Sequence, residues 1–156
     1  MIEIEIPGFR NLSLQHLVLD YNGTLACDGK LLEGVRELLS VLSENVDVHV
    51  ITADTFGLVR TEMNGTPCQI EILERSNEAT QKENFIETLG AESVVAIGNG
   101  NNDRLMLKQA RLGILVIGRE GCSVAALQAA DIVVTDVNAG LDLLIAPLRC
   151  KATLRF

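Results

Sequence analysis

Short apolar segments that alternate with longer helical segments are the feature that most restricts how this chain can fold. Period-two or continuous apolar patterns predict strands at residues 2–6, 16–20, 47–52, 69–73, 93–98, 113–117 and 131–134. Helical spacing of apolar residues predicts helices at residues 33–44, 56–64, 79–89, 102–110, 122–129 and 139–147. Strands joined through helices form right-handed crossovers. The order of segments therefore predicts an α/β fold with a mostly parallel central sheet.

The amino-acid composition agrees with this fold class. The chain has 156 residues, of which 47% are hydrophobic and only 3% aromatic, and it has no Trp. Its apolar content is therefore mostly Leu, Val, Ile and Ala, which is typical of a parallel sheet covered by helices. We expect a single domain over residues 1–156, a Rossmann-like three-layer α/β/α sandwich with a sizeable core.

The formal net charge of −8 limits the classes of partner. An acidic surface repels a phosphate backbone and offers no counterion release, so we expect no nucleic-acid partner. A phosphorylated small molecule can still bind if a metal ion and a lysine reverse the charge locally. No segment approaches the ~20 apolar residues of a membrane span, so we expect no membrane partner.

The cysteines and the N-terminus indicate the compartment. Cys27, Cys68, Cys122 and Cys150 are far apart and form no C-x-x-C pair, as expected of reduced thiols in a cytosolic protein. The opening stretch MIEIEIPGFR alternates apolar and acidic residues and lacks the basic flank and apolar run of a signal peptide. We therefore expect a cytoplasmic protein.

Polar residues stand where several predicted strands end. The stretch LVLDYNGT ends an apolar strand on Asp20 and then turns at once, and a second strand ends on Thr52. The loop GNGNND carries Asp103, and Lys82 is near the start of a predicted helix. Ligands of parallel sheets bind beyond the carboxyl ends of the strands, so these four side chains could converge on one site.

Each of these residues also has a purely structural explanation. The Asn-Gly dipeptide is a common turn pair. Thr52 could be a β-branched strand residue or a helix N-cap, and Lys82 a solvated helix charge. Asp103 could favour the start of its helix through the helix dipole. His49, at alternate spacing within a strand, is expected to be packed rather than catalytic.

The Gly-rich loop excludes two nucleotide-binding motifs. In GNGNND, Asp103 stands where the dinucleotide fingerprint needs Gly, and the sequence has no G-x-x-x-x-G-K-[ST] motif. Neither NAD binding nor P-loop chemistry is supported.

Four motifs, taken in chain order, resemble the signatures of the haloacid dehalogenase-like hydrolases. They are D-x-N-G-T at residues 20–24, the strand-end Thr52, Lys82 on a helix that ends in LG, and IGNGNND at residues 97–103. The resemblance spans nearly the whole chain. The loop GNGNNDRLML is similar to the hinge motif G-D-G-x-N-D of P-type ATPase phosphorylation domains and their small soluble relatives. The resemblance implies a phosphatase that acts through an aspartyl phosphate.

The resemblance also implies a role for each site residue. An Asp carboxylate attacks a phosphoryl group when Mg²⁺ neutralises both anions and fixes an in-line approach. The implied catalytic residues are Asp20 as nucleophile, Asn22, Thr52 and Lys82. The implied Mg²⁺ ligands are Asp20, the backbone carbonyl of Asn22, Asn99 and Asp103. The implied phosphate-binding residues are Gly23, Thr24, Thr52, Ala53 and Lys82, the last of which supplies positive charge.

Two departures from the family pattern put the activity in question. Most phosphatases of this family carry Asp where this chain has Asn22, and that Asp protonates the leaving group and later activates water. Asn22 can do neither. Asn99 replaces the first Asp of the metal loop and removes one formal charge, although an amide oxygen still ligates Mg²⁺. We expect weaker metal binding and slower turnover.

The spacing of the motifs leaves no room for a cap domain. The segments between Asp20 and Thr52, and between Thr52 and Lys82, are long enough only for helices and strands of the sheet itself. The stretch LACDGK is at most a short flap hairpin. A site without a cap is open to water, which predicts a homo-oligomer whose neighbouring subunit covers it, or a phosphoprotein substrate that does so.

Two other functions use similar residues. A catalytically degenerate domain that binds Mg²⁺ or a phosphorylated partner is favoured by Asn22 and Asn99, and the retained Asp20 and Lys82 count against it. A signalling receiver domain also places Asp, Thr and Lys at strand ends. It needs an acidic pair before its acceptor Asp, however, and nothing before Asp20 supplies one.

Overall fold

The computed structural model describes residues 1–54 and 57–156. At its centre is a six-stranded parallel sheet with the order β10-β9-β8-β3-β6-β7. Its strands are β3 (His16–Asp20), β6 (Asp47–Thr52), β7 (Gln69–Ile72), β8 (Val94–Gly98), β9 (Leu112–Val116) and β10 (Ile132–Val134). The predicted α/β class and parallel sheet are confirmed. The bounds of β3 and β6 coincide with the predicted strands.

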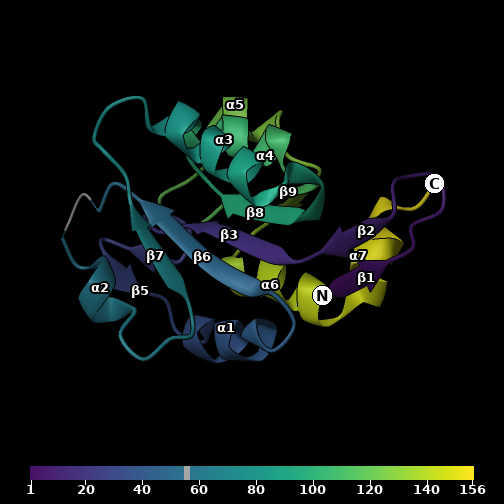
Figure 1. Ribbon diagram of the computed structural model, residues 1–156, viewed down its shortest axis with the longest axis horizontal. Coiled ribbons are helices and arrows are strands. Elements are labelled where there is room, and N and C mark those ends of the chain that lie inside the picture. Colours follow the sequence, from purple (N-terminus) through teal and green to yellow (C-terminus); the bar gives the residue numbers. More distant parts are fainter. Residues whose placement is uncertain (55–56) are drawn as a thin grey trace.

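Helices cover both faces of this sheet (Figure 1). One face is covered by α1 (Val35–Ser43) and α6 (Val137–Ile145), and the other by α3 (Glu78–Leu89), α4 (Arg104–Gln109) and α5 (Val124–Leu127). Side chains of a strand alternate between the faces, so Leu17 and Leu19 of β3 join one apolar core while Val18 joins the other. The arrangement is the predicted three-layer α/β/α sandwich.

The remaining short elements are α2 (Val59–Glu62) and two 3-10 turns, η1 (Ala91–Ser93) and η2 (Asn101–Asp103). The predicted helix at residues 56–64 is represented by α2, and its first residue, Phe56, lies outside the described residues. Gly90, which directly follows the predicted helix at residues 79–89, ends α3 with a φ of 87°. This positive φ suits glycine, which has no Cβ.

The predicted helix at residues 139–147 was wrong at both ends. The helix α6 begins earlier, because the side chain of Asp136 accepts a hydrogen bond from Ala139 N and caps it. Pro147 does not end this helix but begins a new one, α7 (Pro147–Leu154), which was not predicted. Proline is well tolerated in the first turn of a helix, where its missing N–H needs no partner.

The N-terminal strand does not join the central sheet. Instead β1 (Ile2–Ile4) pairs antiparallel with β2 (Leu12–Leu14), which was not predicted, and α7 packs against this hairpin. Phe156 N donates to Pro7 O, so both termini lie at one end of the molecule, away from the arrowheads of β6 and β7 (Figure 1).

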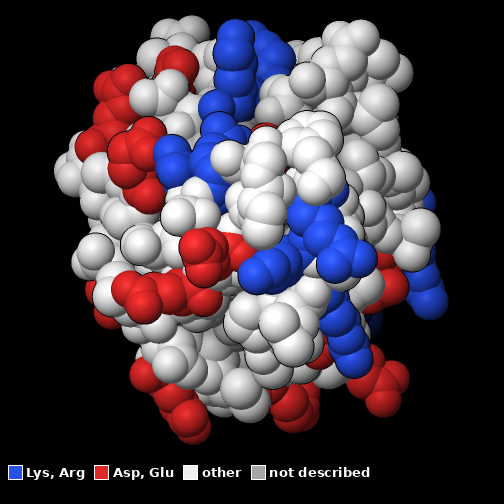
Figure 2. Space-filling view, turned by 90° about the vertical axis from the view of Figure 1, so that its right-hand side faces the viewer, with Lys and Arg blue, Asp and Glu red and all other residues white. Residues whose placement is uncertain are grey.

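Charge is unevenly distributed over this end of the molecule. Figure 2 shows Lys and Arg side chains gathered in the middle of the face, with Asp and Glu mostly towards its left and lower edges. Two of the basic residues of this region, Arg149 and Lys151, belong to α7. The net charge of −8 therefore does not describe every part of the surface.

A short hairpin stands in the place of a cap. Between β3 and β6 the structure has only β4 (Ala26–Cys27), β5 (Lys30–Leu31) and α1, and β4 pairs antiparallel with β5. This hairpin, which we call the flap, lies in the predicted stretch LACDGK. The described residues thus contain no cap domain, as predicted. None of the described helices combines the length and apolar character needed to span a bilayer.

Candidate active site

Three buried charged side chains meet at the carboxyl edge of the sheet. Asp20 ends β3, the strand between β8 and β6, and is 5% exposed. Lys82, on the first turns of α3, is fully buried, and its Nζ lies 2.6 Å from Asp20 Oδ1 and 2.6 Å from Asp103 Oδ1. A lysine without exposed surface is stabilised only by such partners. The structural alternative for Lys82, a solvated helix charge, is therefore wrong.

Asp103 fixes the loop that follows β8. Its Oδ2 accepts hydrogen bonds from Asn99 N at 2.9 Å and Gly100 N at 2.8 Å, while Oδ1 accepts from Lys82. A Cβ added to Gly98 would lie 2.6 Å from Asp103 Cγ, so only glycine fits there. In this structure the Asp103 carboxylate holds the lysine and the loop, and a direct bond to Mg²⁺ stays a prediction.

Thr24 connects the first loop to the loop after β8. Its Oγ1 lies 3.3 Å from both Asp20 Oδ2 and Asn99 Oδ1, and Thr24 is fully buried. Asn99 Nδ2 donates to Gly121 O at 3.1 Å, which turns Oδ1 towards Thr24. Gly23 has a φ of 82°, and a Cβ there would lie 2.4 Å from Asn99 Nδ2. The turn after Asp20 therefore requires glycine for both conformation and space.

The other predicted site residues lie at the same edge of the sheet. Thr52 follows Ile51, which pairs in register with Asp20, and it is 3% exposed. Thr52 Oγ1 accepts from Asp54 N at 3.0 Å, and its hydroxyl hydrogen has no acceptor among the described residues. Ala53 is half-buried beside it. No hydrogen bond joins Thr52 to Asp20 among the described residues.

Asn22 differs from its neighbours because its side chain is not fully bonded. It is half-buried, and its Oδ1 is buried without a hydrogen-bond partner among the residues that the structure describes. Such an acceptor is destabilising by roughly 1–3 kcal/mol until a donor reaches it. Asn22 Oδ1 is therefore an unsatisfied acceptor in the first loop.

Burial and charge set the protonation of the cluster. Burial, helped by the charge of Asp103 and opposed by Lys82, raises the pKa of Asp20 to about 7. Burial alone would lower the pKa of Lys82, but the carboxylates of Asp103 and Asp20 outweigh it and raise that pKa above its ordinary value. The lysine is therefore charged at neutral pH, and two buried carboxylates share one positive charge.

The donor set fits a magnesium ion. Asp20 Oδ2 and Asn99 Oδ1 both face the Thr24 hydroxyl, which brings together two oxygens of the kind that Mg²⁺ prefers. When Asp20 is ionised, the two carboxylates carry one negative charge more than the lysine balances, and a bound cation would neutralise it. The backbone carbonyl of Asn22 belongs to the same first loop. We conclude that oxygen ligands for a hard divalent cation are present at this edge.

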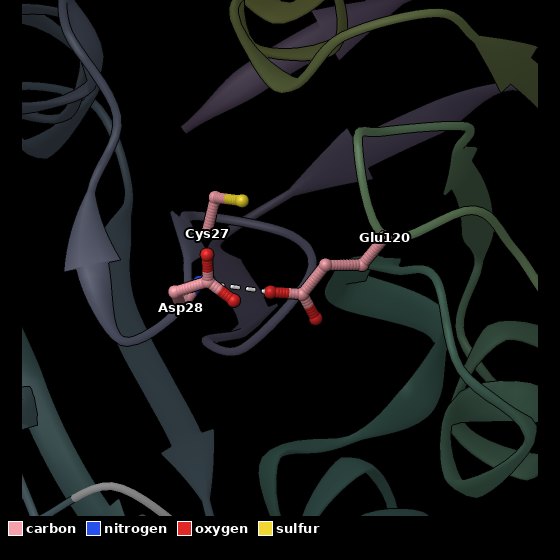
Figure 3. Close-up of side chains that lie close together, drawn as sticks. All are labelled: Cys27, Asp28 and Glu120. Carbon is pink, nitrogen blue, oxygen red and sulfur yellow. Dashed lines mark hydrogen bonds between the residues drawn. The ribbon is translucent and has the colours of Figure 1, made fainter.

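A second group of possible ligands was not predicted. Cys27, Asp28 and Glu120 bring their sulfur and carboxylate oxygens within 4.8 Å of one another at the tip of the flap. Figure 3 shows the Glu120 carboxylate pointing at Asp28, whose backbone N–H donates to Glu120 Oε1 at 2.9 Å. Asp28 and Glu120 are exposed. Nothing in the sequence spacing indicates this group, because it depends on how the flap meets a distant loop.

His49, by contrast, is packed as expected. It is 4% exposed, its ring lies edge-on to Phe85, and its Nε2 is 3.3 Å from His16 Nδ1. The four cysteines are free, and Cys150 is the buried one among them.

Solved structures show which known fold this chain has. A structure described as a hydrolase of the HAD superfamily, subfamily III A, from Legionella pneumophila has a TM-score of 0.72 at 17% identity and covers 91% of this chain and 87% of that one. The 3-deoxy-D-manno-octulosonate 8-phosphate phosphatase of Moraxella catarrhalis, in complex with magnesium, phosphate and KDO, has a TM-score of 0.65 at 17% identity, with 86% of this chain and 87% of that one covered. This chain therefore has the haloacid dehalogenase-like hydrolase fold that its motifs predicted.

The resemblance to P-type ATPases extends to the structure. The catalytic domain of the CPx-ATPase CopB-B has a TM-score of 0.59 at 22% identity, over 73% of this chain and 45% of that one. The sequence is 48% identical over 83 residues to the uncharacterized protein MJ0073 of Methanocaldococcus jannaschii. The matched segment is 51% of this chain and 89% of that protein. The chain belongs to the same family as MJ0073. No family model matches it.

Proposed function

We propose that this protein is a Mg²⁺-dependent phosphatase that hydrolyses phosphomonoesters through an aspartyl phosphate on Asp20. The observation that carries this proposal is the buried cluster in which Lys82 Nζ holds Asp20 and Asp103 at 2.6 Å each. A carboxylate fixed at a strand end beside a buried lysine is ready to meet an anion without rearrangement. The magnesium and phosphate bound by the Moraxella phosphatase of the same fold support this proposal.

Each side chain has a defined task in the reaction. The Asp20 carboxylate forms a bond to phosphorus as the bond from phosphorus to the leaving alcohol oxygen breaks. Lys82 balances the charge of the transferring group, and the Thr52 hydroxyl can donate to its oxygens. Water then attacks the aspartyl phosphate, which releases inorganic phosphate and restores the carboxylate. Mg²⁺, when bound by Asp20, Asn22 and Asn99, would supply positive charge between the carboxylate and the phosphoryl group.

Proton transfer is the weak step of this mechanism. The leaving alcohol needs a proton, and the attacking water must lose one, but the amide of Asn22 neither releases nor takes up a proton at neutral pH. Both protons must therefore come from and go to water. General acid–base catalysis typically contributes about 10²–10⁴ in rate, so we expect slow turnover and a phosphoenzyme that persists.

The test is a Mg²⁺-dependent hydrolysis assay with p-nitrophenyl phosphate and a panel of phosphorylated metabolites. Asp20→Asn is the matched blank, because it removes the nucleophile and keeps the shape of the side chain. We expect phosphate release that needs Mg²⁺ and Asp20, and acid-quenched phosphoprotein in the wild type only. Wild-type rates equal to the blank on every compound would contradict the proposal.

A second function is favoured by one observation. Asn22 and Asn99 together remove the acid–base group and one metal-loop charge, while the cluster around Lys82 remains complete. A domain that binds Mg²⁺ or a phosphorylated partner without turning it over would have this combination. Saturable Mg²⁺ binding in calorimetry, weakened by Asp103→Ala, with no hydrolysis above the blank would identify that function.

A further inference from the structure

A cavity of about 400 Å³ opens beside the candidate active site. It lies between the flap and the loops that follow β9 and β10, at the carboxyl edge of the sheet. Gly23 and Thr24 form part of its wall, and Thr24 also touches the Asp20 carboxylate. The cavity and the phosphoryl site therefore share the first loop. Its size suits a small organic molecule.

The wall of the cavity has an apolar part and a charged part. Leu32, Val116 and Val137 supply apolar surface. Its charged lining residues are Glu33, Arg119, Glu120 and Asp136. Acidic groups thus outnumber the basic one among the lining residues. Asp136 is already engaged as the N-cap of α6, which leaves Glu33 and Glu120 as the acidic groups most available to a ligand.

Two acceptor side chains on this wall have unused hydrogen-bonding capacity among the described residues. Asn138 uses its Nδ2 to donate to Glu33 O at 2.9 Å, and its Oδ1 is buried without a partner among the described residues. Among the described residues, Glu120 accepts one hydrogen bond, through Oε1 from Asp28 N, and the residue is exposed (Figure 3). A molecule with several N–H and O–H groups would complement this wall, because acceptors need donors.

We infer that the cavity holds the leaving group of the phosphomonoester and selects an amino alcohol or amino sugar, whose ammonium faces Glu33 and Glu120. The inference rests on the proposed phosphatase function and adds the class of substrate to it. An ammonium group gains charge-assisted hydrogen bonds from the two glutamates. A carboxylate in the same place would meet the like charge of the two glutamates, which Arg119 offsets only in part. A neutral sugar should bind less strongly than the ammonium compound and more strongly than the carboxylate.

The kinetic test compares three phosphomonoesters of similar size that differ in charge. We expect kcat/KM to fall in the order glucosamine 6-phosphate, glucose 6-phosphate, 6-phosphogluconate. Each step should be about fivefold, the effect of a partly exposed charge pair. Glu33→Gln and Glu120→Gln should each reduce the preference for the amine. Glu44→Gln makes the same change in net charge at the end of α1, outside the cavity, and should keep the preference.

A binding test separates this inference from the phosphatase proposal. Saturation-transfer NMR with glucosamine, glucose and gluconate, in the presence of inorganic phosphate, measures occupation of the cavity without turnover. Stronger transfer to glucosamine in the wild type than in Glu120→Gln supports the inference even if no ester is hydrolysed. Hydrolysis of p-nitrophenyl phosphate without any preference among the three esters overturns the inference and leaves the phosphatase proposal standing. Equal transfer to gluconate and glucosamine, or no transfer to any of the three, also overturns it.

Discussion

Two pairs of carboxylates in this molecule differ in what surrounds them. Asp20 and Asp103 are buried and share the ammonium of Lys82 at 2.6 Å from each. Asp28 and Glu120 are exposed at the flap, and the bond between them comes from a backbone N–H. Acidic residues thus form a buried, ion-paired cluster in one place, which we call the closed pair. In the other place they form a solvent-exposed pair, which we call the open pair.

The difference between the pairs shows how burial changes the hydration and the mobility of a charged side chain. A buried carboxylate loses its hydrating water, and this desolvation is unfavourable unless a fixed partner compensates for it. The geometry of the Lys82 cluster is therefore rigid. An exposed carboxylate keeps water and is screened by salt, so its position is loose and its charge stays available to a ligand. The buried pair, Asp20 and Asp103, is therefore suited to a reaction that needs fixed geometry. The exposed pair, Asp28 and Glu120, is suited to binding a charged ligand.

Removing the lysine should have the largest effect. Lys82→Met leaves two carboxylates buried together, and breaking such a pair typically costs about 3–5 kcal/mol. We expect the free energy of unfolding to fall by about 3 kcal/mol and turnover to fall by at least about a hundredfold. Urea denaturation and a steady-state assay measure the two effects.

The matched control for this change is Lys108→Met, which removes an exposed lysine of α4. It should change the free energy of unfolding by less than about 0.5 kcal/mol. A loss in Lys82→Met no larger than in the control would show that the buried cluster does not stabilise the fold.

Asn22→Asp should have the next largest effect, because it adds a proton donor beside the closed cluster. The two side chains are nearly isosteric, and the backbone carbonyl is unchanged. We expect turnover of p-nitrophenyl phosphate at saturating Mg²⁺ to rise at least about tenfold and the phosphoenzyme to be shorter-lived. Asn101→Asp, the same change at an exposed position of η2, serves as the control. Unchanged turnover in Asn22→Asp would mean that proton transfer does not limit the rate.

His49 sharpens the comparison because it is buried and, among the described residues, forms no salt bridge with a carboxylate. Burial, with a smaller effect from His16, lowers the pKa of His49 below its ordinary value of 6.5. The unfolded chain therefore binds a proton that the folded chain does not, and stability that is present above pH 6.5 is lost as the pH falls below it. Asp47 and Glu71, whose charges favour the protonated ring, oppose this loss.

We expect the wild type to lose free energy of unfolding through His49 as the pH falls from 7.5 to 5.5. His49→Leu should lose correspondingly less over the same interval. Urea denaturation at the two pH values measures this difference, and packing changes caused by the substitution cancel within each protein. The same pH dependence in both proteins would assign the proton uptake to other groups.

Glu120→Gln should have the smallest effect on stability. The amide oxygen can still accept from Asp28 N, and the repulsion between two exposed carboxylates disappears. We expect the free energy of unfolding to change by less than about 0.5 kcal/mol. Asp103→Asn makes the same chemical change in the buried pair and should be destabilising by several times more in urea denaturation. Equal effects in the two variants would remove the distinction between the closed and open pairs.

The sequence predicted the parts of this site that depend on strand ends. Asp20, Thr52 and the loop with Asp103 follow apolar strands, and parallel strands bring such residues to one edge. The two ion pairs of Lys82, with Asp20 and Asp103, were not predictable, because they depend on how α3 packs against the sheet. The contact between Glu120 and the flap was not predictable either, because it depends on how the flap meets the loop after β9.

The missed elements have a local cause. The strand β2 has three residues, too few to show a period, and its partner β1 is in a separate hairpin. The helix α7 begins with Pro147, a residue type that often ends a helix. Its sequence PLRCKATL has one fully buried residue, Cys150. Neither segment carries a pattern strong enough to indicate its structure without the rest of the fold.

The central place of β3 also bears on how the protein opens spontaneously. Its backbone is bonded on one side to β6 and on the other to β8, whereas β7 and β10 are the edges of the sheet. Local openings begin where backbone bonds face solvent, and amide hydrogen exchange reports them strand by strand. We therefore expect the amides of β7 and β10 to exchange while those of Leu17 to Leu19 remain protected. Asp20, the proposed nucleophile, then lies at the end of a strand whose hydrogen bonds persist while the edge strands open.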